Sequence, residues 1–154
     1  GLGDRADRTT PTSHGGALGG RDAPPVVQVS ARSGHALALR ADGVVFSFGC
    51  GGALGDGDDD DERADDARDD AAPRLRERIA PRPVAALSPR RHGDGVEQVA
   101  AGGNFGFDAH SLAMLESGDV LSFGSNNAHG QLGRAVAEPR AAAEDPAPVA
   151  CDWC

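Results

Sequence analysis

The sequence predicts an all-β chain built from two copies of one short unit. A well-kept copy spans residues 110–133, and a weaker copy spans residues 35–55. In both copies a Gly follows the first His after eight residues, Phe-Gly begins after thirteen, and Leu-Gly closes the unit. Spacing kept in this way indicates an internal repeat, and a repeat determines the architecture before any single residue does.

The recurring residues are predicted to fix turns and strand packing. Repeated units share their structure, whereas an active site is usually built only once, so the repetition itself favours a structural role. In the first copy these residues are His35, Gly43, Phe48, Gly49, Leu54 and Gly55. In the second copy they are His110, Gly118, Phe123, Gly124, Gly130, Gln131, Leu132 and Gly133.

Short Val-rich runs at 26–29 and 96–99, bounded by Pro and Gly, favour strands over helices. Gly43 and Gly118 fall where a hairpin turn needs a positive φ, which Gly adopts at little cost. The predicted strands of the first unit are residues 26–31, 35–40, 44–48 and 81–87. Those of the second unit are residues 96–101, 110–115, 119–123 and 146–150.

The remaining segments are assigned around these two units. Residues 1–25 are predicted to be the tail of a preceding unit with a Gly-rich linker, in which residues 11–13, with Leu18 downstream, are the last strand. The first unit is then predicted to cover 26–95 and the second 96–150, and we expect residues 151–154 to begin a continuation of the chain.

An acidic segment interrupts the first unit. Residues 56–70 carry nine Asp and one Glu against two Arg, a net charge of -8. Such a composition buries too little apolar surface to fold, so residues 56–72 are predicted to be disordered or extended. Residues 74–79 show a weak helical pattern, and the second unit carries its own insertion at 105–109.

Five segments occur in a fixed order in the second unit: V-x-Q-V-A-A-G-G-N, H-S-L-A-M, G-D-V-L-S-F-G-S-N, G-Q-L-G and P-x-P-V. This order resembles the repeat of the regulator of chromosome condensation family. The resemblance is close over residues 96–149 and moderate over 26–55, and residues 1–18 fit as the tail of a preceding repeat. The first copy departs from the pattern at Arg32, where the second has Gly102, and after Cys50, where the Asn-containing loop is lost.

The resemblance implies a β-propeller, whose blades are four-stranded antiparallel sheets and whose closed ring protects the strand edges. The chain holds about two blades plus an outer strand of a preceding blade. We therefore expect the remaining blades to come from a longer parent chain or from oligomerisation.

Composition narrows the classes of function. The net charge of -9 makes nucleic acid an unlikely partner, because a nucleic-acid-binding surface is basic. No apolar stretch is long enough to span a membrane, and no signal peptide is visible. Three Cys, an odd number, favour a reducing compartment, so we expect an intracellular protein, cytoplasmic or nuclear.

Two groups of residues invite a metal-binding interpretation, and neither meets it. A calcium loop beginning at Asp56 would need Gly in place of Asp61 and Glu in place of Ala67, so a solvated insertion is favoured. Cys151 and Cys154 have the spacing of a zinc knuckle. Tetrahedral zinc needs four ligands, however, and Cys50 is the only other Cys in the sequence.

No hydrolase nucleophile motif, phosphate-binding loop or dinucleotide fingerprint is present in the sequence. His35 and His110 have no catalytic partner within their own units. The sequence therefore predicts no catalytic residue, no cofactor and no enzyme.

We expect a protein-protein interaction module, a propeller fragment that acts as a scaffold or regulatory domain. The resemblance also implies an alternative, guanine-nucleotide exchange on a Ran-like small GTPase. In that activity one face of the propeller grips the GTPase and displaces the loops that hold phosphate and magnesium. Chromatin binding is disfavoured by the net charge.

Overall fold

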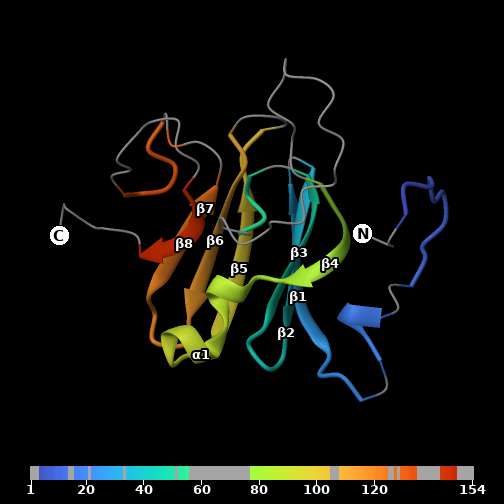
Figure 1. The fold of residues 1–154 in the computed structure, drawn as a ribbon, viewed down its shortest axis with the longest axis horizontal. Helices are drawn as coiled ribbons and strands as arrows, with labels where there is room; N and C mark the ends of the chain where they lie inside the picture. The colour runs from blue at the N-terminus through green and yellow to red at the C-terminus, as the bar shows by residue number, and fades with distance from the viewer. Residues whose placement is uncertain are drawn as a thin grey trace, which may run out of the picture.

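The computed structural model contains two four-stranded antiparallel sheets, which lie side by side in Figure 1. It describes residues 4–13, 16–20, 22–32, 34–50, 52–55, 77–104, 108–124, 127, 129–134 and 143–148, the last segment by its backbone only. In each sheet every strand is hydrogen-bonded to the next strand along the chain. The first sheet consists of β1 (Val26–Arg32), β2 (His35–Arg40), β3 (Val45–Cys50) and β4 (Glu77–Pro83). The second sheet consists of β5 (Val96–Gly102), β6 (His110–Leu115), β7 (Val120–Gly124) and β8 (Ala143–Pro148).

The two sheets share one pairing register. His35 lies opposite Gly49, and His110 lies opposite Gly124. The first strand of each sheet has an irregularity at the same place, between Val26 and Gln28 in β1 and between Val96 and Gln98 in β5. The prediction of an all-β fold made of two equivalent four-stranded units is therefore confirmed.

The hairpin turns depend on Gly at the two predicted positions. Gly43 has a φ of 77° and Gly118 a φ of 91°, in the region that L side chains rarely adopt. A close approach of two backbones requires a third glycine. A Cβ atom on Gly49 would lie 2.2 Å from the carbonyl oxygen of Gly34, so no larger residue fits there.

The fourth strands differ from the prediction. β4 spans Glu77–Pro83, earlier than the predicted 81–87, and β8 spans Ala143–Pro148, earlier than 146–150. The weak helical pattern at 74–79 is wrong for residues 77–79, which belong to β4: Glu77 pairs with Cys50 and Arg78 with Gly49 of β3. Residues 74–76 lie outside the described residues. Residues Ala85–Leu87 leave the sheet as a 3₁₀ turn, η2.

A one-turn helix, α1 (Pro89–His92), follows η2 and was not predicted. Pro89 stands at its N-terminus and Gly93 caps its C-terminus with a φ of 72°. Both residues are in the positions that such a turn favours, so the signal was present in the sequence.

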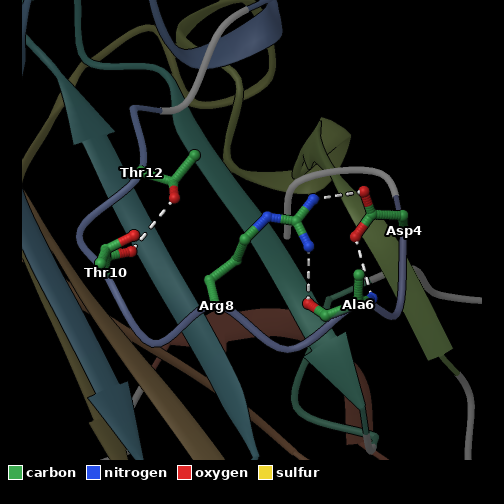
Figure 2. Close-up of polar contacts among 5 residues, drawn as sticks. All are labelled: Asp4, Ala6, Arg8, Thr10 and Thr12. Carbon is green, nitrogen blue, oxygen red and sulfur yellow. Dashed lines mark hydrogen bonds and ion pairs between the residues drawn. The ribbon is translucent and has the colours of Figure 1, made fainter.

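Residues 11–13, predicted to be the last strand of a preceding unit, do not form a strand. Figure 2 shows that the N-terminal segment instead makes local contacts: Arg8 pairs with Asp4, and the hydroxyl of Thr12 donates to the carbonyl of Thr10. A strand needs a neighbouring strand to pair with, and no strand of the described residues pairs with this segment. Leu18, which was predicted to accompany this strand, is instead buried in the 3₁₀ turn η1 (Gly16–Leu18).

The main core lies between the two sheets, and we call it the inter-sheet junction. A smaller cluster lies on the opposite face of the first sheet, where Leu18 packs with Ala38 and Phe46. The buried residues of the junction are Leu37, Leu39, Val45, Val84, Leu87, Val96, Val99, Ala113, Leu115, Leu121 and Phe123.

Candidate interaction surface

Polar side chains of β1 tie the first sheet to the backbone of β5. The carboxamide of Gln28 donates to the carbonyl of Val99 at 2.8 Å and accepts from the Val99 amide at 2.9 Å. The hydroxyl of Ser30 accepts from the amide of Ala101 at 2.9 Å. These contacts satisfy backbone groups on the edge of β5 that would otherwise lie unpaired between two sheets.

His35 is part of the same junction. Its Nε2 atom lies 3.0 Å from the hydroxyl oxygen of Ser111, and that hydroxyl donates to the carbonyl of Ala53 at 2.9 Å. Ser111 has a single hydroxyl proton, so His35 must donate through Nε2. Burial lowers the pKa of His35 below its ordinary value of 6.5, which keeps the ring neutral.

The third strands carry an equivalent serine in both sheets. The Ser47 hydroxyl donates to the Leu54 carbonyl at 2.7 Å, and the Ser122 hydroxyl donates to the Leu132 carbonyl at 2.6 Å. These bonds hold each Leu-Gly loop against its own sheet. In the first sheet, Arg78 donates to the Ser47 oxygen at 2.6 Å, and burial lowers the pKa of Arg78 to about 10.

In the second sheet, Arg134 takes the equivalent role from the loop and reaches Ser122 at 3.3 Å. Asn127 closes this loop from within. Its side-chain oxygen accepts from the Leu132 amide, and its side-chain nitrogen donates to the Arg134 carbonyl. The first sheet has Cys50 and two glycines instead of this Asn-containing loop.

The structure thus places the predicted repeat residues in turns, strands and loops. Phe123 and Leu132 are buried, and Gly43 and Gly118 form the hairpin turns. The sequence singled out His35 but missed its partner Ser111 and the cross-sheet residue Gln28. The recurrence of Gln at 28 and 98 and of Ser at 47 and 122 was the signal available for such residues.

The segments that join the strands lie at the two opposite ends of the strands. One end of the strands carries the hairpin turns at 41–43 and 116–119, together with α1 (Figure 1). Asp94 links α1 to the second hairpin, because its carboxylate accepts from the amide of Ser117 at 2.7 Å. Hydrogen bonds from the Ser117 side chain and backbone lower the pKa of Asp94.

The other end of the strands carries the segments that differ most between the two copies; we call it the divergent-loop end. Its described residues include 52–55, 103–104, 108–109 and 129–134. Most of the 105–109 insertion and the acidic segment at 56–72 lie outside the described residues, as do Cys151 and Cys154. Among the residues that the structure describes, no three His, Cys, Asp or Glu side chains gather as a metal site, and no helix could span a membrane.

Known proteins resemble both the sequence and the fold. Residues 96–131 match the family model of the regulator of chromosome condensation (RCC1) repeat. The human probable E3 ubiquitin-protein ligase HERC3 is 38% identical over 110 residues, which cover 70% of this chain and 8% of that protein. Yeast RCC1 (Prp20), in its crystal structure with Kap60, superposes with a TM-score of 0.60 at 18% identity, over 88% of this chain and 27% of that one. Human WBSCR16 superposes with a TM-score of 0.57 at 23% identity, over 84% of this chain and 26% of that one.

Two consecutive four-stranded antiparallel sheets, packed face to face in the same register, are blades of a β-propeller, so the chain is part of such a propeller. The repeat match and the structural likenesses identify which one. The chain belongs to the regulator of chromosome condensation repeat family and is a partial copy of its propeller.

Proposed function

We propose that the chain is a protein-interaction module, a part of a regulator of chromosome condensation-like propeller that serves as a scaffold or regulatory domain. The partner would bind at the end of the strands that carries the divergent loops. The nearest support outside the chain is the likeness to yeast Prp20, a protein solved bound to Kap60.

One observation carries this proposal. Two of the polar side chains that recur between the copies, Ser47 and Ser122, are directed at the backbone of their own sheet, where each holds a Leu-Gly loop. They are therefore committed to the architecture. What remains for recognition is the sequence that does not repeat, the 105–109 insertion and the acidic segment at 56–72.

The alternative is guanine-nucleotide exchange on a Ran-like small GTPase. It is favoured by the likeness to yeast Prp20p, a protein that was studied for its binding to Gsp1p and histones. Exchange requires a propeller face that grips the GTPase, and it needs no acid, base or nucleophile from the chain. This chain spans 28% of that Prp20p chain, so the gripping face would have to be completed by further blades.

The two functions separate in a direct measurement. A Ran-type GTPase loaded with a fluorescent GDP analogue is mixed with the chain, or with the longest natural protein that contains it, and release of the analogue is followed. A scaffold leaves the release rate unchanged. Release accelerated in proportion to the protein concentration would replace the scaffold proposal with the exchange activity.

The scaffold proposal has its own test in proximity labelling inside cells. A variant lacking residues 105–109 is compared with the unmodified chain and with an Arg90→Ala, Arg91→Ala control. Both control residues are exposed and lie in α1, at the opposite end of the strands. The loop variant is expected to lose labelled proteins that the control keeps. Identical labelling by all three proteins would show that the divergent loop does not recognise partners.

A further inference from the structure

Ser88 is a serine whose hydroxyl the fold does not use. It joins η2 to α1 at the N-cap position, where a serine side chain ordinarily bonds to an amide of the first turn. Here the amide of Arg91 donates instead to the backbone carbonyl of Ser88 at 2.9 Å, and the side chain makes no capping bond. Among the residues that the structure describes, the Ser88 hydroxyl has no other hydrogen-bond partner, and Ser88 is partly exposed.

The serines of the junction and of the third strands behave differently. The hydroxyls of Ser47, Ser111 and Ser122 are fully buried, and each donates to a backbone carbonyl. These bonds hold loops against the sheets. Ser88 contributes no such bond, so its hydroxyl is available to a reagent from outside the chain.

The residues from Ser88 onward form the pattern Ser-Pro-Arg-Arg at 88–91. Proline has no amide N–H, and it holds the preceding residue in an extended conformation. Ser88 has that conformation, with a φ of -66° and a ψ of 140°. A proline-directed protein kinase offers no hydrogen-bond acceptor to the residue after the serine, so any other residue there would leave its amide unpaired. The Ser88-Pro89 pair meets this requirement.

Two arginines supply charge for recognition. Arg90 and Arg91 are exposed, and neither makes an ion pair with another described residue. They stand two and three residues after Ser88 in a chain whose net charge is -9. A kinase with an acidic site for the third residue after the serine would bind Arg91 by charge-assisted hydrogen bonds.

The segment can reach a kinase because α1 is loosely held. It is one turn of four residues, none of them buried, and a single turn is not stable by itself. The Nε2 atom of His92 lies 2.7 Å from the carbonyl oxygen of Ala86, and just beyond the turn Asp94 bonds to Ser117. Breaking these few contacts opens α1 locally and leaves both sheets paired.

We propose that Ser88 is a phosphorylation site for a proline-directed protein kinase that also binds Arg91. The Ser88 hydroxyl oxygen attacks the γ-phosphorus of ATP. The new Oγ–P bond replaces the bond from that phosphorus to the oxygen shared with the β-phosphate, ADP leaves, and the hydroxyl proton passes to an aspartate of the kinase. The site lies next to α1, away from the divergent-loop end (Figure 1), so it does not rest on the proposed function.

The new phosphate finds a partner in α1. Arg91 follows Ser88 by three residues, so the two side chains lie on the same side of the turn. A phosphate carries a charge of about -1.5 to -2 at neutral pH, and its pairing with Arg91 should hold α1 closed. The amide of Gly93, which donates to the Pro89 carbonyl at 2.8 Å, reports this closure. Its hydrogen exchange should slow roughly threefold after phosphorylation, and an unchanged rate would contradict the pairing.

The test is phosphate transfer from ATP to the whole folded chain by a cyclin-dependent kinase, with the modified residue located by mass spectrometry. A single phosphate on Ser88 is expected. Ser88→Ala should lose it and keep its thermal midpoint, because the side chain makes no bond in the fold. Thr10-Pro11 is the other Ser/Thr-Pro pair of the chain and has no arginine at 12 or 13, so it is the internal control. No phosphate on Ser88, or equal phosphate on Thr10, overturns the proposal.

Two arginine variants separate recognition from exposure. Arg91→Ala should slow transfer to Ser88 about tenfold, because a charge-assisted contact with the kinase is lost. Arg90→Ala removes the same charge one residue earlier in the same exposed turn and should slow transfer less than about twofold. Equal rates for Arg91→Ala and the unmodified chain would overturn recognition of this segment.

A destabilised variant shows whether the folded chain is the substrate. Leu37→Ala weakens the inter-sheet junction, so it raises the population of fully unfolded chains. Local opening of α1 predicts an unchanged rate of transfer to Ser88 in this variant. A rate that rises in parallel with the unfolded population would mean that only the unfolded chain is modified, and it would overturn the site.

Discussion

Val29 and Val99 occupy the same place in two sheets of the same register, yet one is 73% exposed and the other 2%. His35 and His110 differ in the same way: the first is buried against Ser111, and the second is partly exposed. The repeat sets the backbone of each sheet, but the neighbouring sheet determines how much each residue contributes to stability. Equivalent substitutions in the two copies should therefore have unequal effects.

The largest difference is expected between Leu37→Ala and Leu112→Ala. Leu37 is fully buried in the inter-sheet junction, so its truncation leaves a cavity and should cost about 3 kcal/mol of unfolding free energy. Leu112 is only partly buried, and its truncation should cost about 1 kcal/mol. Chemical denaturation at a concentration where the chain is monomeric gives both values. Equal costs would mean that the junction does not carry the core.

The hairpin glycines should differ next. Gly118→Ala places a Cβ in open space and costs about 1 kcal/mol from the positive φ alone. Gly43→Ala adds a contact of 3.0 Å with the Cα atom of Gly95, so it should cost about 2 kcal/mol. The difference in thermal midpoint between the two variants measures how closely the first hairpin approaches Gly95, just before β5. If Gly118→Ala is the more damaging of the two, that close approach is wrong.

Gln28→Ala should cost about 1–2 kcal/mol, because the amide and carbonyl of Val99 lose their partner between the sheets. Gln98→Ala in the monomeric chain should change stability by less than about 0.5 kcal/mol, because Gln98 is exposed. Denaturation curves of the two variants provide a matched comparison. A cost for Gln98→Ala as large as that for Gln28→Ala would mean that the two hydrogen bonds between Gln28 and Val99 are not what stabilises the junction.

The smallest effect is a dependence on pH. Burial lowers the pKa of His35, so the unfolded chain takes up its proton first as the pH falls below 6.5. The His35 contribution therefore makes the folded state less stable as the pH falls below that value. The unfolding free energy of His35→Gln should fall less between pH 7.5 and 5.5 than that of the unmodified chain. His129→Gln, at an exposed site, is the control, and the same pH slope in all three proteins would contradict the prediction.

The sequence predicted the parts of the fold that local patterns determine. The hairpins around Gly43 and Gly118 follow from glycine spacing and strand propensity, and their strands lie within one or two residues of the predicted bounds. β4 began earlier than predicted because its start is set by the edge of β3, not by the proline-rich run itself. Residues 11–13 formed no strand in the described structure because strand formation depends on a partner.

The polar contacts of the junction could not be predicted from local sequence patterns. Gln28 and Val99 are 71 residues apart in sequence, and His35 and Ser111 are 76 apart. Such pairs become visible only when the two sheets are packed face to face. The recurrence of Gln at 28 and 98 marks the position but does not reveal that one copy is engaged and the other exposed.

Amide hydrogen exchange at Val99 and Val29 tests the central claim most directly, namely that the neighbouring sheet and not the repeat itself protects these positions. The Val99 amide donates to the Gln28 side chain at 2.9 Å within the junction, whereas Val29 lies on the outer face. In the monomeric chain, Val99 should exchange slowly and Val29 quickly, and Gln28→Ala should bring the Val99 rate towards that of Val29. Equal rates in the unmodified chain, or a Val99 rate unchanged by Gln28→Ala, would contradict it.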